Sequence, residues 1–153
     1  ALTGVPAGRL VDRLGSTRVV FIGLGFVAIG SVLMVFIPGT FGVGGYVGGL
    51  AMITFGYALF QAANNTAVMN GAAKDLRGVT SALLGLSRNL GLILGASAMG
   101  ALFALGASSA GIPGLGSGGE AGLQLTFSVA VAIAGLALAI AFWGSRRREE
   151  VQR

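Results

Sequence analysis

The sequence lacks the side chains that carry most enzymatic chemistry. Its 153 residues include no histidine and no cysteine, which excludes disulfides, thiolate nucleophiles, imidazole bases and the common zinc ligand sets. Acidic residues are few and lie outside the long apolar runs: Asp12, Asp75, Glu120, Glu149 and Glu150. They are too scattered to form a paired-carboxylate site. The sequence therefore predicts a protein that is not an enzyme and that has no metal site.

Charge is scarce and apolar side chains are abundant. Only 10% of the residues are charged and 54% are hydrophobic, with a mean hydropathy of +0.86, whereas soluble domains have roughly 25% charged residues. A net charge of +5 would suit a nucleic acid, but the basic residues lie at the ends of apolar runs, where membrane topology explains them. We therefore expect a lipid bilayer, and no nucleic acid, as the environment of this chain.

Four apolar runs are long enough to cross a membrane as helices, which predicts an all-α integral membrane fold. The expected transmembrane helices are residues 19–37, 46–69, 81–105 and 123–143. Pro38, Gly39 and the following glycines predict a break after the first of them. Residues 1–18 form a charged segment, 106–122 a flexible Gly/Ser-rich loop and 144–153 a basic tail.

The basic residues predict the orientation of the chain. All ten Lys and Arg residues except Arg88 lie before the first span, between the second and third, or after the fourth. Because basic loops stay in the cytoplasm, both ends and the loop at 70–80 should be cytoplasmic, and loop 106–122 extracytoplasmic. The expected location is the inner or plasma membrane, as a multi-pass protein.

The second span becomes polar toward its cytoplasmic end. Gln61, Asn64 and Asn65 have the i, i+3, i+4 spacing of one helix face. Amides in hydrocarbon need partners, so these residues either form hydrogen bonds between helices or line a wet substrate cavity. The sequence favours the two alternatives about equally.

The third span contains an arginine, Arg88, followed by Asn89. Its charge would lie roughly 10 Å from the basic loop, at an insertion cost of about 2.5–3.5 kcal/mol for a central arginine. Such a side chain faces a protein partner or an aqueous cavity, or reaches the interface. Gly91, Gly95 and Gly100 provide small residues on this span, which predicts close helix packing.

The loop at 106–122 contains a G-x-G-x-x-G pattern at Gly114, Gly116 and Gly119. A dinucleotide site needs a strand before this pattern and a helix after it. A loop between two membrane spans provides no such strand, so we expect no cofactor.

Two segments resemble one transporter family. Gly8, Leu10, Asp12, Arg13 and Gly15, with Arg18 shortly after, precede the first span and resemble the cytoplasmic loop signature G-x-L-a-D-R-x-G of the major facilitator superfamily. Ser16 and Thr17 stand where basic residues are common in that family. The run from Arg77 through Arg88-Asn89-Leu90-Gly91 to Ala96 is similar to the penultimate core helix of the 14-helix drug/proton antiporter branch.

The resemblance implies a role for each span. The four would be the last four helices of a carboxy-terminal six-helix bundle, the first and fourth peripheral. Gln61, Asn64 and Asn65 would line the central cavity, while Arg88 and Asn89 would meet the opposite half.

A fragment of a secondary active transporter is the function that the resemblance implies. It would be a proton-coupled multidrug efflux antiporter working by alternating access, which needs two repeats, so this chain would not transport alone. Its partners would be the remaining amino-terminal helices and a small hydrophobic or cationic substrate. No acid lies within the spans, so a proton-carrying carboxylate would lie elsewhere in the parent.

An independent small four-helix membrane protein is the alternative. An oligomeric exporter of this size should have a membrane-embedded glutamate, and the spans contain none. A non-transporting membrane module would have no reason to retain the signature loop.

Overall fold

The structure is a computed structural model that describes residues 11, 13–36, 38–108 and 118–151. Its main elements are four long helices: α2 (Ser16–Phe36), α3 (Pro38–Gly71), α4 (Arg77–Ser108) and α5 (Gly119–Val151). The short 3-10 helix η1 (Lys74–Leu76) joins α3 to α4. The described residues contain no strand, so the expected all-α fold is confirmed.

All four long helices are long and apolar enough to cross a membrane, within Ser16–Phe36, Val43–Gly71, Lys74–Ser108 and Gly119–Ser145. The shortest, α2, has 21 residues, which gives about 32 Å at 1.5 Å per residue. All four helices begin before the predicted apolar runs, and α3, α4 and α5 also end after them. The chain is therefore a multi-pass membrane protein.

The break between the first two long helices lies earlier than the sequence predicts. Pro38 and Gly39 are already helical, because α3 begins at Pro38. Proline suits a first helical position, where its missing N–H would have no intrahelical partner. The expected connection at 38–45 is therefore the first two turns of α3.

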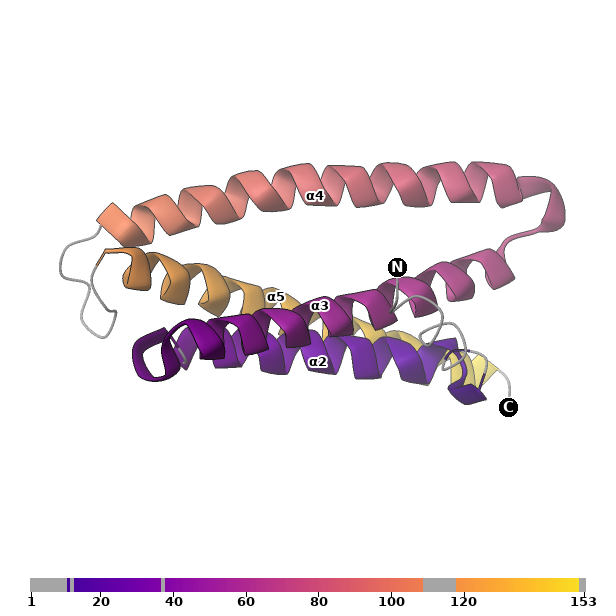
Figure 1. Ribbon diagram of the computed structural model, residues 1–153. Coiled ribbons are helices and arrows are strands. Elements are labelled where there is room, and N and C mark those ends of the chain that lie inside the picture. The colour runs from indigo at the N-terminus through magenta and orange to yellow at the C-terminus, as the bar shows by residue number, and fades with distance from the viewer. Residues whose placement is uncertain (1–10, 12, 37, 109–117, 152–153) are drawn as a thin grey trace.

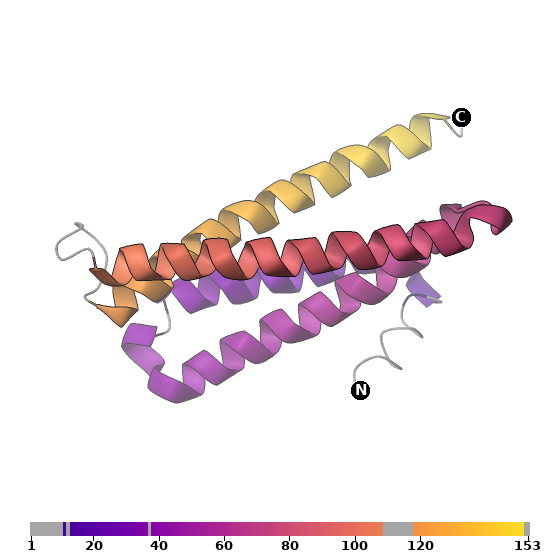
Figure 2. The same ribbon diagram turned by 90° about the horizontal axis from the view of Figure 1, so that it is seen from above.

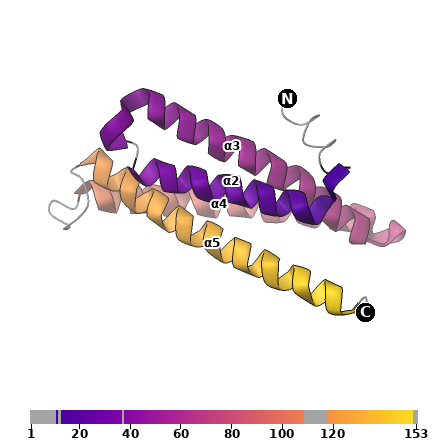
Figure 3. The ribbon, with the colours of Figure 1, turned by 90° about the horizontal axis from the view of Figure 1, so that it is seen from below.

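Three of the helices form a layer and the fourth lies over it. In this layer α2 lies between α3 and α5 and packs against both (Figure 3). Figures 1 and 2 show α4 crossing above the layer. The start of α2, the η1 turn and the end of α5 lie at one end of the bundle (Figure 1).

Glycines bring α2 and α3 into direct backbone contact. A Cβ added to Gly23 would lie 2.8 Å from the carbonyl oxygen of Gly56, and a Cβ added to Gly56 would lie 2.7 Å from the carbonyl oxygen of Gly23. Further along, a Cβ on Gly49 would lie 2.7 Å from Sδ of Met34, which is fully buried. We call this contact the α2–α3 seam, formed by Gly23, Gly30, Gly49 and Gly56.

The core at the η1 end of the bundle joins the segment before α2 to the last turns of α3. Val11, Val19, Leu59 and Ala63 form one buried cluster. Gly15 ends the segment before α2 with a φ of 80°, and its N–H donates to the carbonyl of Val11 at 2.9 Å. This left-handed geometry favours glycine and gives the signature loop its turn.

The helices α4 and α5 meet closely at the opposite end. A Cβ on Gly106 would lie 2.8 Å from the carbonyl oxygen of Ala121, and one on Gly122 would lie 2.7 Å from that of Phe103. Gly106 is the one buried residue of α4. Away from this contact α4 is largely uncovered within the part of the chain that the structure describes.

Candidate functional site

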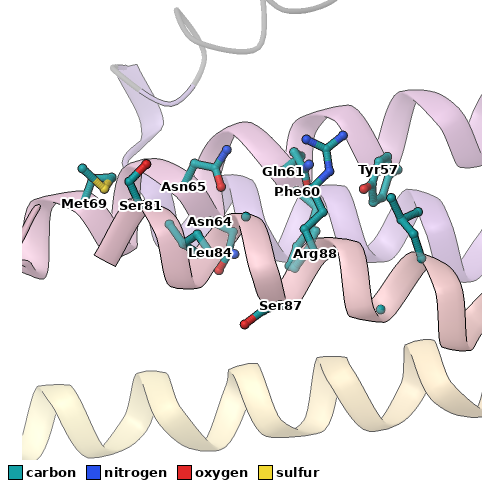
Figure 4. Close-up of a pocket in the computed structure, with 13 residues that line it drawn as sticks. Tyr57, Phe60, Gln61, Asn64, Asn65, Met69, Ser81, Leu84, Ser87 and Arg88 are labelled. Carbon is teal, nitrogen blue, oxygen red and sulfur yellow. The ribbon is translucent and has the colours of Figure 1, made fainter. Parts of the chain in front are cut away.

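A cavity of about 660 Å³ lies between α3 and α4. Figure 4 shows the side chains of both helices around it. The lining residues are Tyr57, Phe60, Gln61, Asn64, Asn65, Met69, Ser81, Leu84, Gly85, Ser87, Arg88, Gly91 and Leu92. Volumes of this size are typical of small-molecule sites.

Helical periodicity places these residues on one face of each helix. On α3, Tyr57, Gln61, Asn65 and Met69 recur every four residues and therefore form a stripe. The opposite face of α3, with Leu59 and Ala63, is buried in the core. The polar stripe is thus turned away from the core and toward α4.

Arg88 reaches across the cavity to Gln61. Its side chain leaves α4 and ends beside the Gln61 amide (Figure 4). With the amide oriented so that its oxygen faces the guanidinium, this oxygen accepts from Nε of Arg88 at 2.8 Å and lies 3.1 Å and 3.3 Å from the two Nη atoms. This contact links α3 and α4 across the cavity.

The cavity lining contains one formal charge, that of Arg88. The amides of Asn64 and Asn65 make no hydrogen bond to any described residue. Asn64 is half-buried and Asn65 is exposed. The site therefore offers a cation and several unpaired hydrogen-bonding groups beside an apolar wall, an arrangement suited to binding rather than covalent chemistry.

The two interpretations of the polar second span can now be compared. Within the described residues, Gln61 hydrogen bonds to another helix, whereas Asn64 and Asn65 line the cavity without such a bond. Two nearby hydroxyls bond inside α3 instead: Thr54 to the Leu50 carbonyl at 2.8 Å, and Thr66 to that of Ala62 at 2.9 Å. That these amides bind substrate stays a prediction.

Of the other residues predicted to matter in the third span, only some lie beside the cavity. Asn89 follows Arg88 but does not line the cavity, whereas Gly91 does. A Cβ added to Gly91, Gly95 or Gly100 would meet no atom within 4 Å. Within the described residues no other segment lies against the Cβ side of these glycines, and packing against a further segment stays a prediction.

The signature loop is described only in part. Gly8, Leu10 and Asp12 lie outside the described residues, as do Gly114 and Gly116. Arg13 lies just before α2 and Arg18 in its first turn, and both are exposed. The role of this loop in contacting other helices stays a prediction.

The polar pattern of the sequence does not identify several of the residues that line the cavity, among them Tyr57, Phe60, Met69 and Leu84. The signal that identifies Tyr57 and Met69 is the four-residue spacing on either side of Gln61 and Asn65. Apolar residues on such a stripe cannot be distinguished from lipid-facing residues before the position of the neighbouring helix is known. Composition alone therefore does not identify them.

A comparison with protein-family models agrees with the signature loop. The model described as Major Facilitator Superfamily matches residues 1–96, more than half of the chain. This region includes α2, α3 and the part of α4 that carries Arg88. No curated protein and no solved structure matches the chain. The chain thus belongs to the major facilitator superfamily, a family of membrane transporters.

Proposed function

We propose that this chain forms the carboxy-terminal part of a proton-coupled drug efflux antiporter of the 14-helix branch. Alternating access requires two repeats that move about a site near the middle of the membrane, and the described residues provide four candidate spans. The remaining helices of the parent transporter would supply the second wall of the cavity and the proton-carrying carboxylate. Alone, the chain would bind but not transport.

The observation that carries this proposal is the cavity between α3 and α4. The cavity has a volume of about 660 Å³. Its amides and its guanidinium belong to two helices that are long enough to cross a membrane. Polar groups inside a membrane span generally mark a substrate or ion pathway. An apolar wall with a few polar groups suits a small hydrophobic substrate. A cationic substrate would find its counter-charge on the missing helices, since no acid lines the cavity.

The basic residues support the orientation of the chain. Four basic residues are exposed next to the start of α2 or around η1: Arg13, Arg18, Lys74 and Arg77. Figure 1 shows the start of α2 and η1 at the end of the bundle where α5 also finishes. We place this end in the cytoplasm because basic loops are retained there.

The test is an efflux assay on the complete protein that contains this chain. The protein is tagged at its carboxy terminus at its own gene, sized in membranes, and expressed in a drug-sensitive host. Efflux of a panel of neutral hydrophobic, cationic and anionic dyes is measured with and without a protonophore. We expect a product several times larger than 15.2 kDa and efflux that the protonophore stops.

Arg88→Ala should reduce efflux while the amount of tagged protein in the membrane stays the same. Arg77→Ala is the matched control, because Arg77 is an exposed arginine at the start of the same helix and outside the cavity. Efflux that Arg88→Ala leaves unchanged would contradict a role for the cavity, and efflux insensitive to the protonophore would contradict proton coupling.

A further inference from the structure

The cavity between α3 and α4 has the wrong charge for a cation and the right charge for an anion. Resting on the proposed function, we propose that it binds the carboxylate head of an amphiphilic organic anion, with Arg88 as the principal contact. This assigns hydrophobic organic acids to the α3–α4 cavity as a ligand class, whereas a cationic substrate of the proposed function would bind to acidic groups on other helices.

Arg88 determines the charge of the cavity. It is the one charged residue of the lining. The acidic side chains that the structure describes, Asp75 and Glu120, lie in η1 and in the first turn of α5, outside the lining. In surroundings of low dielectric constant, a charge attracts an opposite charge and repels a like charge more strongly than in water. An organic anion is therefore favoured in this cavity, and a quaternary ammonium is disfavoured.

The hydrogen-bonding geometry leaves donors for a ligand. A guanidinium has five N–H donors, whereas the oxygen of Gln61 has two lone pairs. The contact with Gln61, shortest at 2.8 Å to Nε, therefore orients the guanidinium without using all its donors. The remaining N–H groups form the planar fork that matches a carboxylate.

Neighbouring amides add further donors of the same kind. When the oxygen of the Gln61 amide faces Arg88, the NH₂ group of the same amide can donate to another partner. Asn64 and Asn65 also line the cavity and have no hydrogen-bond partner among the described residues. A carboxylate accepts several such bonds at once, so these groups complete its coordination.

The rest of the lining is suited to an apolar body. Tyr57, Phe60, Leu84 and Leu92 line the same cavity. Aromatic and aliphatic walls bind the hydrocarbon part of a ligand, while a few polar groups fix its orientation. The site is therefore amphiphilic in the same sense as the proposed ligand.

The rival interpretation is that Arg88 only holds α3 and α4 together through Gln61, or pairs with a carboxylate of another segment. In either case Arg88 does not increase the affinity of the cavity for a ligand with a carboxylate. Three probes with one apolar body and different heads separate the interpretations: 4-phenylbutyrate, its neutral amide, and the corresponding trimethylammonium.

The complete protein is placed in phosphatidylcholine nanodiscs, and the affinity of each probe is measured by isothermal titration calorimetry. We expect 4-phenylbutyrate to bind about tenfold to a hundredfold more tightly than the amide, the range of a hydrogen-bonded charge, and the cation to bind most weakly. Arg88→Gln should make the carboxylate and amide affinities equal. Arg88→Lys should keep part of the preference, because lysine keeps the charge but not the planar fork.

Arg77→Gln is the control for loss of a positive charge from the same helix, and it should retain the full preference. The proposal is overturned if no probe binds, if the wild-type protein does not prefer the carboxylate, or if Arg88→Gln retains that preference. Protonophore-sensitive efflux of the dye panel would survive those results, so a failure here is distinguishable from a failure of the proposed function.

Discussion

The two faces of α3 (Pro38–Gly71) are packed in opposite ways. Toward α2 it presents Gly49 and Gly56, which allow backbone atoms of the two helices to meet. Toward α4 it presents Tyr57, Gln61 and Asn64, which line a cavity. One helix is therefore fixed on one side and open on the other.

The difference shows how this chain separates stability from function. Close backbone approach, as in the α2–α3 seam, maximises van der Waals contact, which drives helix association where the hydrophobic effect is absent. The α3–α4 side has polar groups and space instead, and α4 is held at its ends by η1 and by Gly106 against α5. The α2–α3 pair is therefore closely packed, whereas the close backbone contact of α4 with α5 lies at the Gly106 end of α4.

The largest expected contrast is in chemical access to the two faces of α3. Ala63 is fully buried in the core, and its sequence neighbour Asn64 lines the cavity. These 153 residues contain no cysteine, so an introduced thiol is the one target within them for a membrane-impermeant methanethiosulfonate reagent, and peptide mapping separates its labelling from that of any thiol elsewhere. Asn64→Cys should react rapidly in the native protein, whereas Ala63→Cys should react only after denaturation.

Mass spectrometry measures the labelled fraction of each variant with time. Prior addition of 4-phenylbutyrate should slow the labelling of Asn64→Cys if that ligand occupies the cavity. Equal labelling of the two variants would show that α3 does not have one open face and one closed face.

The next largest effect should come from the seam. A Cβ at Gly56 would lie 2.6 Å from Cβ of Phe26 and 2.8 Å from the backbone nitrogen of Val27. The helices must separate to admit it, so Gly56→Ala should lower the free energy of unfolding by about 1–3 kcal/mol. Reversible unfolding in mixed micelles, titrated with sodium dodecyl sulfate, measures the change.

Gly48→Ala is the matched control on the same helix, because a Cβ there meets no atom within 4 Å and alanine favours a helix over glycine by about 0.5–1 kcal/mol. Gly23→Ala should destabilise like Gly56→Ala. The double variant should lose less unfolding free energy than the two single variants lose together, since one separation of α2 and α3 relieves both clashes. A stable Gly56→Ala protein would mean that the seam is looser than the structure shows.

A smaller effect is expected for the contact across the cavity. The oxygen of Gln61 accepts from Nε of Arg88 at 2.8 Å, but Arg88 is exposed and Gln61 is only half-buried. A double-mutant cycle with Gln61→Ala and Arg88→Ala should give a coupling energy of about 0.5–1.5 kcal/mol in unfolding. A coupling near zero would mean that the two side chains do not meet in the membrane.

Much of this fold is predictable from composition and periodicity. Length and hydropathy alone identify the four spans, because only helices of this length satisfy backbone hydrogen bonding inside a bilayer. The same physics does not locate helix ends, since Pro38 can begin a helix as readily as break one. The expected loop at 38–45 and the observed helical start of α3 differ for this reason.

The candidate site is predictable only in its polar residues. Gln61, Asn64 and Arg88 stand out because such side chains are rare in hydrocarbon, and all three line the cavity. Glycine spacing is a weaker guide: the sequence predicts close packing at Gly91, Gly95 and Gly100, whereas the close contacts among the described residues are those of the seam and of Gly106 with α5. Which glycines meet depends on the positions of neighbouring helices, and no single-helix pattern contains that information.

The smallest effect should come from hydroxyls that bond within their own helix. Ser31 is buried in α2, and its hydroxyl donates to the Val27 carbonyl at 2.8 Å. Thr54 donates likewise to Leu50. Neither bond joins two helices, and each carbonyl retains its place in the helix when the hydroxyl is removed. Ser31→Ala and Thr54→Val should therefore change the free energy of unfolding by less than about 0.5 kcal/mol in the micelle titration used for Gly56→Ala. A loss as large as that of the seam variant would show that these hydroxyls bond between helices, and stability would then depend on polar contacts as well as on glycine packing.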